Sequence, residues 1–386
     1  MRRREIPSLL QRRMRGAHVC LLPDITLSHR EDLPVKPAPS GRRVPVAAAA
    51  ALSVLSLSLF AGCARVEHVG PGAAAEVRLG FFPNVTHASA LIARGKGFYA
   101  KELGGTRLTA QQFNAGPDEV TALLDGSLDA GFIGSGPAVT AFARSAGKGV
   151  RVVSGATSGG AQLVVKPGIA APEQLRGRTI AVPQRGNTQD IALRKWLAGK
   201  GLAIGAGPNE VNVVTMDNPQ TFDAFRSGRL DGGWLPEPWA SRLVIDAGGR
   251  VLQDERALWP GGKFPTTVLL VRTQFLREHP ATVEALLRAE QDAIEFAAAD
   301  HDEAETVVND QLRQLTGGEL SRPVLDRALA NIELTTDPLA VEFNQLAGDE
   351  VTAGVVRTTP DLTGFIDVEP LNRVRHERGK PPVDPG

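Results

Sequence analysis

The chain has 386 residues, too many for one compact core, so we expect two domains or one large α/β unit. Its hydrophobic fraction of 42% and charged fraction of 22% are typical of globular proteins. The two cysteines, Cys20 and Cys63, are too few for a disulfide framework or a multi-cysteine metal or iron–sulfur site. Residues 1–43 contain ten of the 43 basic but only four of the 43 acidic residues, which leaves the rest of the chain acidic. An acidic body argues against nucleic acid as a partner.

An export signal is predicted near the N-terminus. Arg42 and Arg43 precede an uncharged run, 44–60, which ends at small residues directly before Cys63. The run is short for a membrane span, which needs about 20 apolar residues. Cys63 after small residues resembles a bacterial lipobox, although Phe60 stands where that pattern prefers leucine. We therefore expect a lipid on Cys63 to anchor the protein on the extracytoplasmic face of the cell membrane.

The segment before this signal fits no ordinary signal peptide. Residues 1–41 mix arginine clusters with acids and prolines. We interpret them as the product of a wrongly assigned start, since a start at Val35 gives a signal of ordinary length; a genuine extension is the alternative. We exclude 1–62 from the fold, and we read 63–76 as a tether of small residues.

Strands and helices alternate after the tether, which is typical of a parallel sheet covered on both faces. We first predict strands at 77–82, 108–113, 130–133 and 150–154, and helices at 87–101, 117–124 and 138–146. The pattern restarts with strands at 179–182, 211–215, 231–235 and 268–271, and helices at 188–198 and up to 222–227. Mainly helical segments follow at 282–299, 303–316, 322–331 and 338–354, and then a tail at 373–386 that we expect to be loose.

One segment is echoed later in the chain. Residues 126–137 align with 228–239, with glycine, Leu-Asp, glycine, an aromatic and an aliphatic residue in register. Chance in a glycine-rich sequence is the alternative, but a match over a whole turn favours duplication or two lobes of similar architecture. The echo places Ser135 and Glu237 at the carboxyl ends of strands, where open α/β sheets bind ligands.

Five motifs together resemble the substrate-binding proteins of ABC importers, in particular the aliphatic sulfonate/nitrate/taurine class. In chain order they are Leu79-Gly-Phe-Phe-Pro-Asn-Val-Thr-His-Ala, Gly97-Phe-Tyr, Leu128-Asp-Ala-Gly-Phe-Ile-Gly-Ser-Gly-Pro-Ala, Gly186-Asn-Thr-Gln-Asp and Trp234-Leu-Pro-Glu-Pro-Trp-Ala. The resemblance implies an α/β, two-lobed type II periplasmic-binding-protein fold, in which each lobe has a mixed or parallel sheet flanked by helices.

The resemblance also implies how the lobes are joined and which partners the protein binds. Two hinge strands connect lobe 1, at 77–165 and 270–372, to lobe 2, at 166–269, and ligand closes the cleft between them. The expected partners are a small anion and the permease subunits of the importer. We expect a monomer without a cofactor or metal.

Several loops at strand ends are suited to an anion. Helix N-termini present free N–H groups and a positive dipole end, and hydroxyl groups add donors. The candidate substrate-binding residues in such loops are Thr86, His87, Ser135, Gly136, Thr157, Ser158, Asn187 and Thr188. Taken singly, each is as well explained as a helix cap; taken together, they favour a sulfonate. Nitrate, taurine and a thiamine-pyrimidine precursor are the alternative ligands.

Other side chains have a structural and a functional interpretation. Glu237 repels a sulfonate, so it is either structural or reads an amino end of the ligand. Arg185 and Lys263 are either solvated or near the cleft. Trp234 and Trp239 either line an alkyl site or belong to the core.

Enzyme classes fit less well. The sequence has no glycine-rich phosphate loop, nucleophile elbow or paired-histidine zinc motif. Thiamine-pyrimidine synthases share the expected fold, but they carry a cysteine-rich motif that this chain lacks. We therefore expect a binding protein and not an enzyme.

Overall fold

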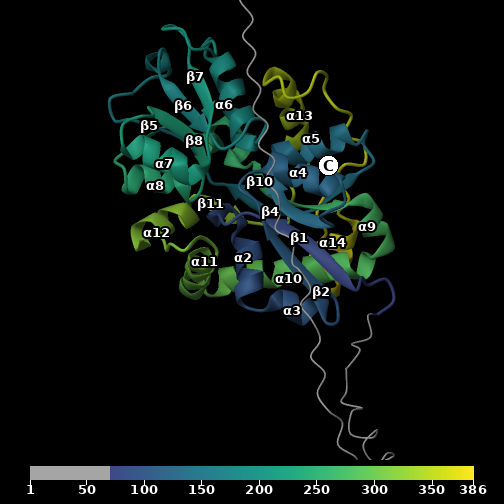
Figure 1. Cartoon of the computed structure of the whole chain (residues 1–386). Helices are drawn as coiled ribbons and strands as arrows, with labels where there is room; N and C mark the ends of the chain where they lie inside the picture. The colour runs from purple at the N-terminus through teal and green to yellow at the C-terminus, as the bar shows by residue number, and fades with distance from the viewer. Residues whose placement is uncertain (1–69) are drawn as a thin grey trace, which may run out of the picture. The chain divides into compact units, whose positions relative to one another are not determined.

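Within residues 70–386, which a computed structural model describes, the larger of two sheets has six strands (Figure 1). Their order across the sheet is β11 (Ile332–Leu334), β4 (Val150–Gly159), β10 (Pro265–Arg272), β3 (Ala130–Gly134), β1 (Glu76–Phe81) and β2 (Arg107–Gln112). β1 is parallel to β2 and β3, whereas β10 runs antiparallel to β3 and β4. The sheet is therefore mixed, and we call it, with the helices around it, lobe 1.

The second sheet repeats this arrangement on a shorter stretch of chain. Its order is β7 (Asn212–Thr215), β6 (Thr179–Val182), β8 (Gly232–Pro236), β5 (Ala161–Val165) and β9 (Arg250–Asp254). β6 is parallel to β7 and β8, and β5 is antiparallel to β8 and β9. The strands β7, β6, β8, β5 and β9 thus occupy the places of β2, β1, β3, β10 and β4. The echoed segments supply equivalent strands, β3 and β8, and we call the second sheet with its helices lobe 2.

Helices follow the strands in both lobes. Lobe 1 carries α2 (Ala88–Gly95), α3 (Phe98–Leu103), α4 (Gly116–Leu124), α5 (Ser135–Arg144), α9 (Thr273–Glu278), α10 (Pro280–Ala299), α11 (His301–Thr316), α12 (Arg322–Ala330), α13 (Glu342–Thr352) and α14 (Glu369–Glu377). Lobe 2 carries α6 (Thr188–Gly199), α7 (Asn218–Arg226) and α8 (Trp239–Ile245). The helix expected at 87–101 is interrupted because Gly97 adopts a φ of 74°, which favours glycine. In the part of the chain that the structure describes, no helix has the length and apolarity needed to cross a membrane.

The chain passes between the lobes at different residues from those we expected. β5 already belongs to the second sheet, and β10 returns to the first sheet at Pro265. The crossings therefore lie five residues before the boundaries expected after residues 165 and 269. The first crossing occurs at Gly159 and Gly160, whose φ values of 80° and 79° turn the chain out of β4. Both flanking strands are buried almost throughout, so burial continues across the break and does not reveal it.

The C-terminal segment, expected to be loose, packs on lobe 1. Val374 and Val383 are buried, the first of them within α14. The side chain of Asn372 donates to the carbonyl of Val383 and accepts from its N–H, at 3.0 and 2.7 Å. The charged composition of this segment led to the wrong prediction. The apolar residues that pack on lobe 1 are few, because they come from only one face of α14 and from Val383.

The apolar core continues from one lobe to the other. A single cluster of buried side chains contains Ile133 and Phe142 of lobe 1 together with Trp196 and Trp234 of lobe 2. The two lobes are therefore packed against each other, as in the closed form of a hinged protein.

Candidate binding site

Two helix N-termini meet where the lobes touch. α5 begins at Ser135 directly after β3, and α6 begins at Thr188 after the loop that follows β6. The N–H of Gly136 donates to Oγ1 of Thr188 across the lobes, at 3.4 Å. Each helix start has unpaired N–H groups and a positive dipole end. The lobes thus bring two electropositive helix ends to one place.

A cavity of about 30 Å³ lies at this junction. Its lining includes Asn84, Thr86, His87, Gly134, Asn187, Thr188, Thr266 and Thr267. Among the described residues that line it, no side chain is an acid, a lysine or an arginine. The volume is about that of one water molecule, so a larger ligand enters only when the lobes separate.

Two hydroxyl groups beside the cavity lack partners. Within residues 70–386, Oγ of Ser135 and Oγ1 of Thr267 are buried and make no hydrogen bond. Thr267 lines the cavity, and Ser135 immediately follows Gly134, which also lines it. Buried hydroxyls are ordinarily paired, so both have a proton available for a bound group with acceptor atoms. Thr188 accepts from Gly136 and keeps its own proton to donate.

Thr86 and His87 line the cavity, but their protons are already used. His87 Nε2 lies 3.1 Å from the carbonyl oxygen of Phe132, which can only accept, so the ring proton sits on Nε2. Nδ1 then accepts from the hydroxyl of Thr86, at 3.2 Å. Burial lowers the pKa of His87 to about 3, so the ring is neutral. Both side chains line the cavity with their hydrogen-bonding groups already paired with each other and with the backbone, and their contact with the ligand stays a prediction.

Thr157 and Ser158 lie inside β4 and not in a loop, contrary to the prediction. Thr157 donates its hydroxyl proton to the carbonyl of Thr86 at 2.7 Å, and the Ser158 hydroxyl accepts from the N–H of Phe264 at 3.2 Å. β4 ends at the crossing between the lobes, at Gly159 and Gly160. The two hydroxyls therefore hold the chain in place beside this crossing, and they do not line the cavity.

Asn187 reaches the cavity as the N-cap of α6. Its Oδ1 accepts from the N–H of Asp190, and its Nδ2 donates to Gln189, both at 2.9 Å. Its amide group is therefore committed to the helix start. Of the predicted residues, Ser135 and Thr188 keep a hydroxyl proton to donate at the junction, whereas the N–H of Gly136 already donates to Thr188.

Glu237 does not line the cavity, and its role in ligand binding stays a prediction. Its carboxylate is fully buried and accepts from Arg327 at 3.2 Å and Asn331 at 2.7 Å, on or beside α12. The N–H of Ser241 donates to its other oxygen at 3.0 Å. Burial raises the pKa of Glu237, while the bonds from Asn331 and Ser241 oppose that rise. Both carboxylate oxygens are thus engaged, and Oε1 forms a clasp between the start of α8 and the end of α12.

A larger chamber adjoins the small cavity through Asn84, which lines both. It has a volume of about 440 Å³, within the usual range for small-molecule sites. Trp239 lines it and donates its indole proton to Oδ1 of Asn84 across the lobes, at 3.0 Å. Arg242 also lines it, with its guanidinium 4.9 Å from the centroid of the Trp239 ring. Trp239 therefore walls the chamber, whereas Trp234 is core.

Sequence reasoning missed three chamber residues, Asn84, Asn218 and Arg242. Asn84 follows β1 and Asn218 begins α7, so the rule about strand ends would have found the first two. Within the described chain, Oδ1 of Asn218 is buried and makes no hydrogen bond. Arg242 lies in the second turn of a helix, and no local signal distinguishes it from a solvated arginine.

The two other singled-out cations lie elsewhere. Arg185 pairs with Asp190 at 2.8 Å and donates to the carbonyl of Ala353, also at 2.8 Å, which joins lobe 2 to the end of α13. Lys263 pairs with Glu333 at 2.8 Å on the surface. Neither lines the cavity or the chamber. Cys63 lies outside the described residues.

Comparison with known proteins identifies relatives of this architecture. The chain is 30% identical over 207 residues to the taurine-binding periplasmic protein of Escherichia coli (strain K12), a match covering 53% of this chain and 61% of that protein. The match thus spans less than two thirds of that relative.

Solved structures share the fold at low identity. The alkanesulfonate-binding protein SsuA from Xanthomonas axonopodis pv. citri, bound to MOPS, superposes with a TM-score of 0.62 at 21% identity, covering 76% of this chain and 99% of that one. The periplasmic nitrate-binding protein NrtA from Synechocystis PCC 6803 does so with a TM-score of 0.64 at 15% identity, covering 78% and 89%. These likenesses confirm the two-lobed binding-protein fold. The NMT1-like family matches residues 70–309, more than half of the chain, and the protein belongs to that family.

Proposed function

We propose that this protein is the substrate-binding component of an ABC importer, and that it captures a small aliphatic sulfonate between its lobes. The observation that carries the proposal is the meeting of α5 and α6, with the hydroxyl donors of Ser135 and Thr188 in or beside a cavity whose described lining carries no formal charge. Neutral donors at helix N-termini are a recurrent way to bind an anion. The relatives named for taurine and alkanesulfonate binding support the same ligand class.

A sulfonate suits donors that come from two sides. It stays ionised at neutral pH, and its three oxygens accept hydrogen bonds from several directions. Ser135 and Gly136 belong to lobe 1, whereas Thr188 belongs to lobe 2. Since neither lobe alone satisfies all three oxygens, binding favours the closed arrangement.

The adjoining chamber supports a sulfonate in preference to nitrate. Nitrate has no tail, whereas an aliphatic sulfonate needs room beyond its head group. The chamber of about 440 Å³, walled by Trp239 and reached past Asn84, offers that room. Taurine and a thiamine-pyrimidine precursor are the alternatives that the chamber also admits.

The proposed location rests on the export signal predicted before Cys63 and on a relative named as periplasmic. The protein is exported, is held at the membrane by a lipid on Cys63, and delivers its ligand to the permease as a monomer. It performs no chemistry on the ligand, in keeping with relatives that are named as binding proteins.

A thermal-shift screen tests the ligand. The panel is ethanesulfonate, taurine, nitrate and a hydroxymethylpyrimidine, each added to the purified protein. A ligand at a hundred times its dissociation constant adds about 2.7 kcal/mol to the free energy of unfolding. We expect a sulfonate to raise the melting temperature most. Tight binding of nitrate or the pyrimidine, without sulfonate binding in calorimetry, would overturn the proposal.

Two substitutions test the donors. Ser135→Ala or Thr188→Val removes one hydroxyl, and a hydrogen bond to a charged group is worth about 1.5–3 kcal/mol, so sulfonate affinity should fall roughly ten- to a hundredfold. Thr352→Val is the matched control, because that exposed hydroxyl bonds only within α13. Unchanged affinity in both cavity variants would remove these groups from the site.

A further inference from the structure

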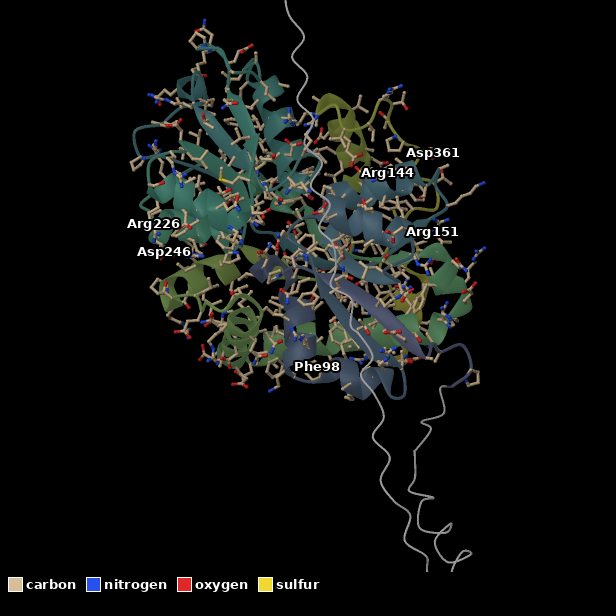
Figure 2. The ribbon with its side chains drawn as sticks, in the orientation of Figure 1. Phe98, Arg144, Arg151, Arg226, Asp246 and Asp361 are labelled. Carbon is tan, nitrogen blue, oxygen red and sulfur yellow. The ribbon has the colours of Figure 1, made fainter. Side chains whose placement is uncertain are left out.

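A second hollow lies on lobe 1, away from the junction of the lobes. It has a volume of about 620 Å³ and lies between the C-terminal end of α5 and the segment 356–363 that follows α13. Because α5 begins at the junction, its far end lies at the opposite edge of the lobe. Figure 2 shows Arg144 and Asp361 near each other on this side of the molecule, with Arg151 below them.

Basic side chains without ion-pair partners gather at this hollow. Arg144, Lys148 and Arg357 line it and are exposed. Across residues 70–386, no carboxylate lies within 4.0 Å of their charged groups. Lys101, in contrast, pairs with Asp292 at 2.8 Å, although it is equally exposed. The concentration of unpaired positive charge contrasts with the acidic composition of the chain after residue 43.

One acid at the rim offsets part of this charge and leaves a positive excess among the described residues that line the hollow. Asp361 is the acidic residue among the described residues lining the hollow, and its Oδ1 accepts from both the N–H and the hydroxyl of Thr363, at 2.9 and 2.7 Å. Arg151 adds a cation nearby, with its guanidinium 5.5 Å from the centroid of the Phe142 ring that helps to line the hollow. It donates to the carbonyls of Gly147 and Val150 and pairs with no carboxylate in the described part of the chain.

We propose that this basic hollow, defined by Arg144, Lys148 and Arg357, is a binding site for phosphate-bearing anions. Guanidinium groups match phosphate oxygens with two parallel N–H donors, and an ammonium adds a mobile point charge. Three cations around one hollow call for more than one negative charge, as in a pyrophosphate or a pair of neighbouring lipid headgroups. The site is separate from the cleft, so it does not depend on the identity of the cleft ligand.

Two probes distinguish the sources of phosphate. Calorimetry with inorganic pyrophosphate reports a free anion, and co-sedimentation with vesicles of phosphatidylglycerol and phosphatidylcholine, against phosphatidylcholine alone, reports a membrane surface. The Cys63→Ser form is used in the vesicle assay, so that a lipid anchor does not contribute. We expect binding to at least one probe that weakens as salt is raised. Binding to neither probe at low salt would overturn the proposal.

A triple variant locates the site. Arg144→Gln, Lys148→Gln and Arg357→Gln together should lower the affinity for the bound probe at least tenfold. The control removes three exposed cations elsewhere, Arg176, Lys200 and Arg229, each replaced by glutamine, with the same change in net charge. An equal loss in the control, or no loss in the triple variant, would contradict a defined site. Unchanged melting temperature and cleft-ligand binding would show that the fold and the proposed function are intact.

Discussion

Gly136→Ala should block closure of the lobes while leaving each lobe folded. Gly136 lies in the first turn of α5, on lobe 1, where alanine is compatible with the helical backbone. A Cβ atom built there would lie 2.6 Å from Cδ1 of Ile191 and 3.4 Å from Cα of Thr188. Both contacts belong to α6, on lobe 2. The added methyl group thus meets the opposite lobe, and the clash is present only when the lobes are closed.

The size of the effect follows from this distance. Carbon atoms in contact are ordinarily about 3.5–4.0 Å apart, so the methyl group of Ile191 must retreat by about 1 Å. Overpacking of this kind costs about 1–3 kcal/mol. Since the ligand binds the closed form, its dissociation constant should rise roughly five- to a hundredfold. The flexible end of Ile191 favours the lower part of this range.

Calorimetry with ethanesulfonate and small-angle scattering measure the two consequences. The radius of gyration of the wild-type protein should fall when ligand is added, and that of Gly136→Ala should fall less. Gly348→Ala in α13 is the control, because no atom lies within 4 Å of a Cβ at that position. An unchanged dissociation constant for Gly136→Ala would refute the reasoning. So would a melting temperature that falls without ligand in Gly136→Ala but not in Gly348→Ala, since the clash would then lie within a lobe.

Three further predictions concern the clasp, the dependence on pH and the anchor. Glu237→Gln should lower the free energy of unfolding by about 1–3 kcal/mol, because it weakens the bond with Arg327. It should change the affinities for taurine and ethanesulfonate equally. A selective loss of taurine affinity would show that Glu237 contacts the ligand. Burial raises the pKa of Glu255 from 4.5 to about 8, so the folded protein holds a proton that the unfolded chain releases, and stability should fall as pH rises from about 4.5 to about 8. Chemical denaturation at several pH values should show that Glu255→Gln removes a contribution of at most about 1.4 kcal/mol per pH unit; identical curves for both proteins would contradict the assignment. Cys63→Ser should release the folded protein from membranes in cell fractionation, and retention as firm as that of the wild type would exclude a lipid as the anchor.

The sequence alone was sufficient to predict the layout of the lobes and the region of the site. Alternating strands and helices indicate sheets covered by helices, because each element must bury one apolar face. The echo between 126–137 and 228–239 correctly indicated equivalent strands, β3 and β8, in two sheets of the same order. The rule that ligands bind beyond the carboxyl ends of strands led to Ser135 and Thr188, and the structure places the starts of α5 and α6 together.

Only the tertiary structure decided which of the candidate groups remain available. Thr86 and His87 have side chains that can donate to an anion, but they hydrogen-bond to each other and to the carbonyl of Phe132. Glu237 is engaged by Asn331, which is distant in the sequence. The same holds for the chamber, where Asn84 of lobe 1 meets Trp239 of lobe 2. A residue type specifies which hydrogen bonds a side chain can make, whereas the packing of segments far apart in the chain determines which of them are already made.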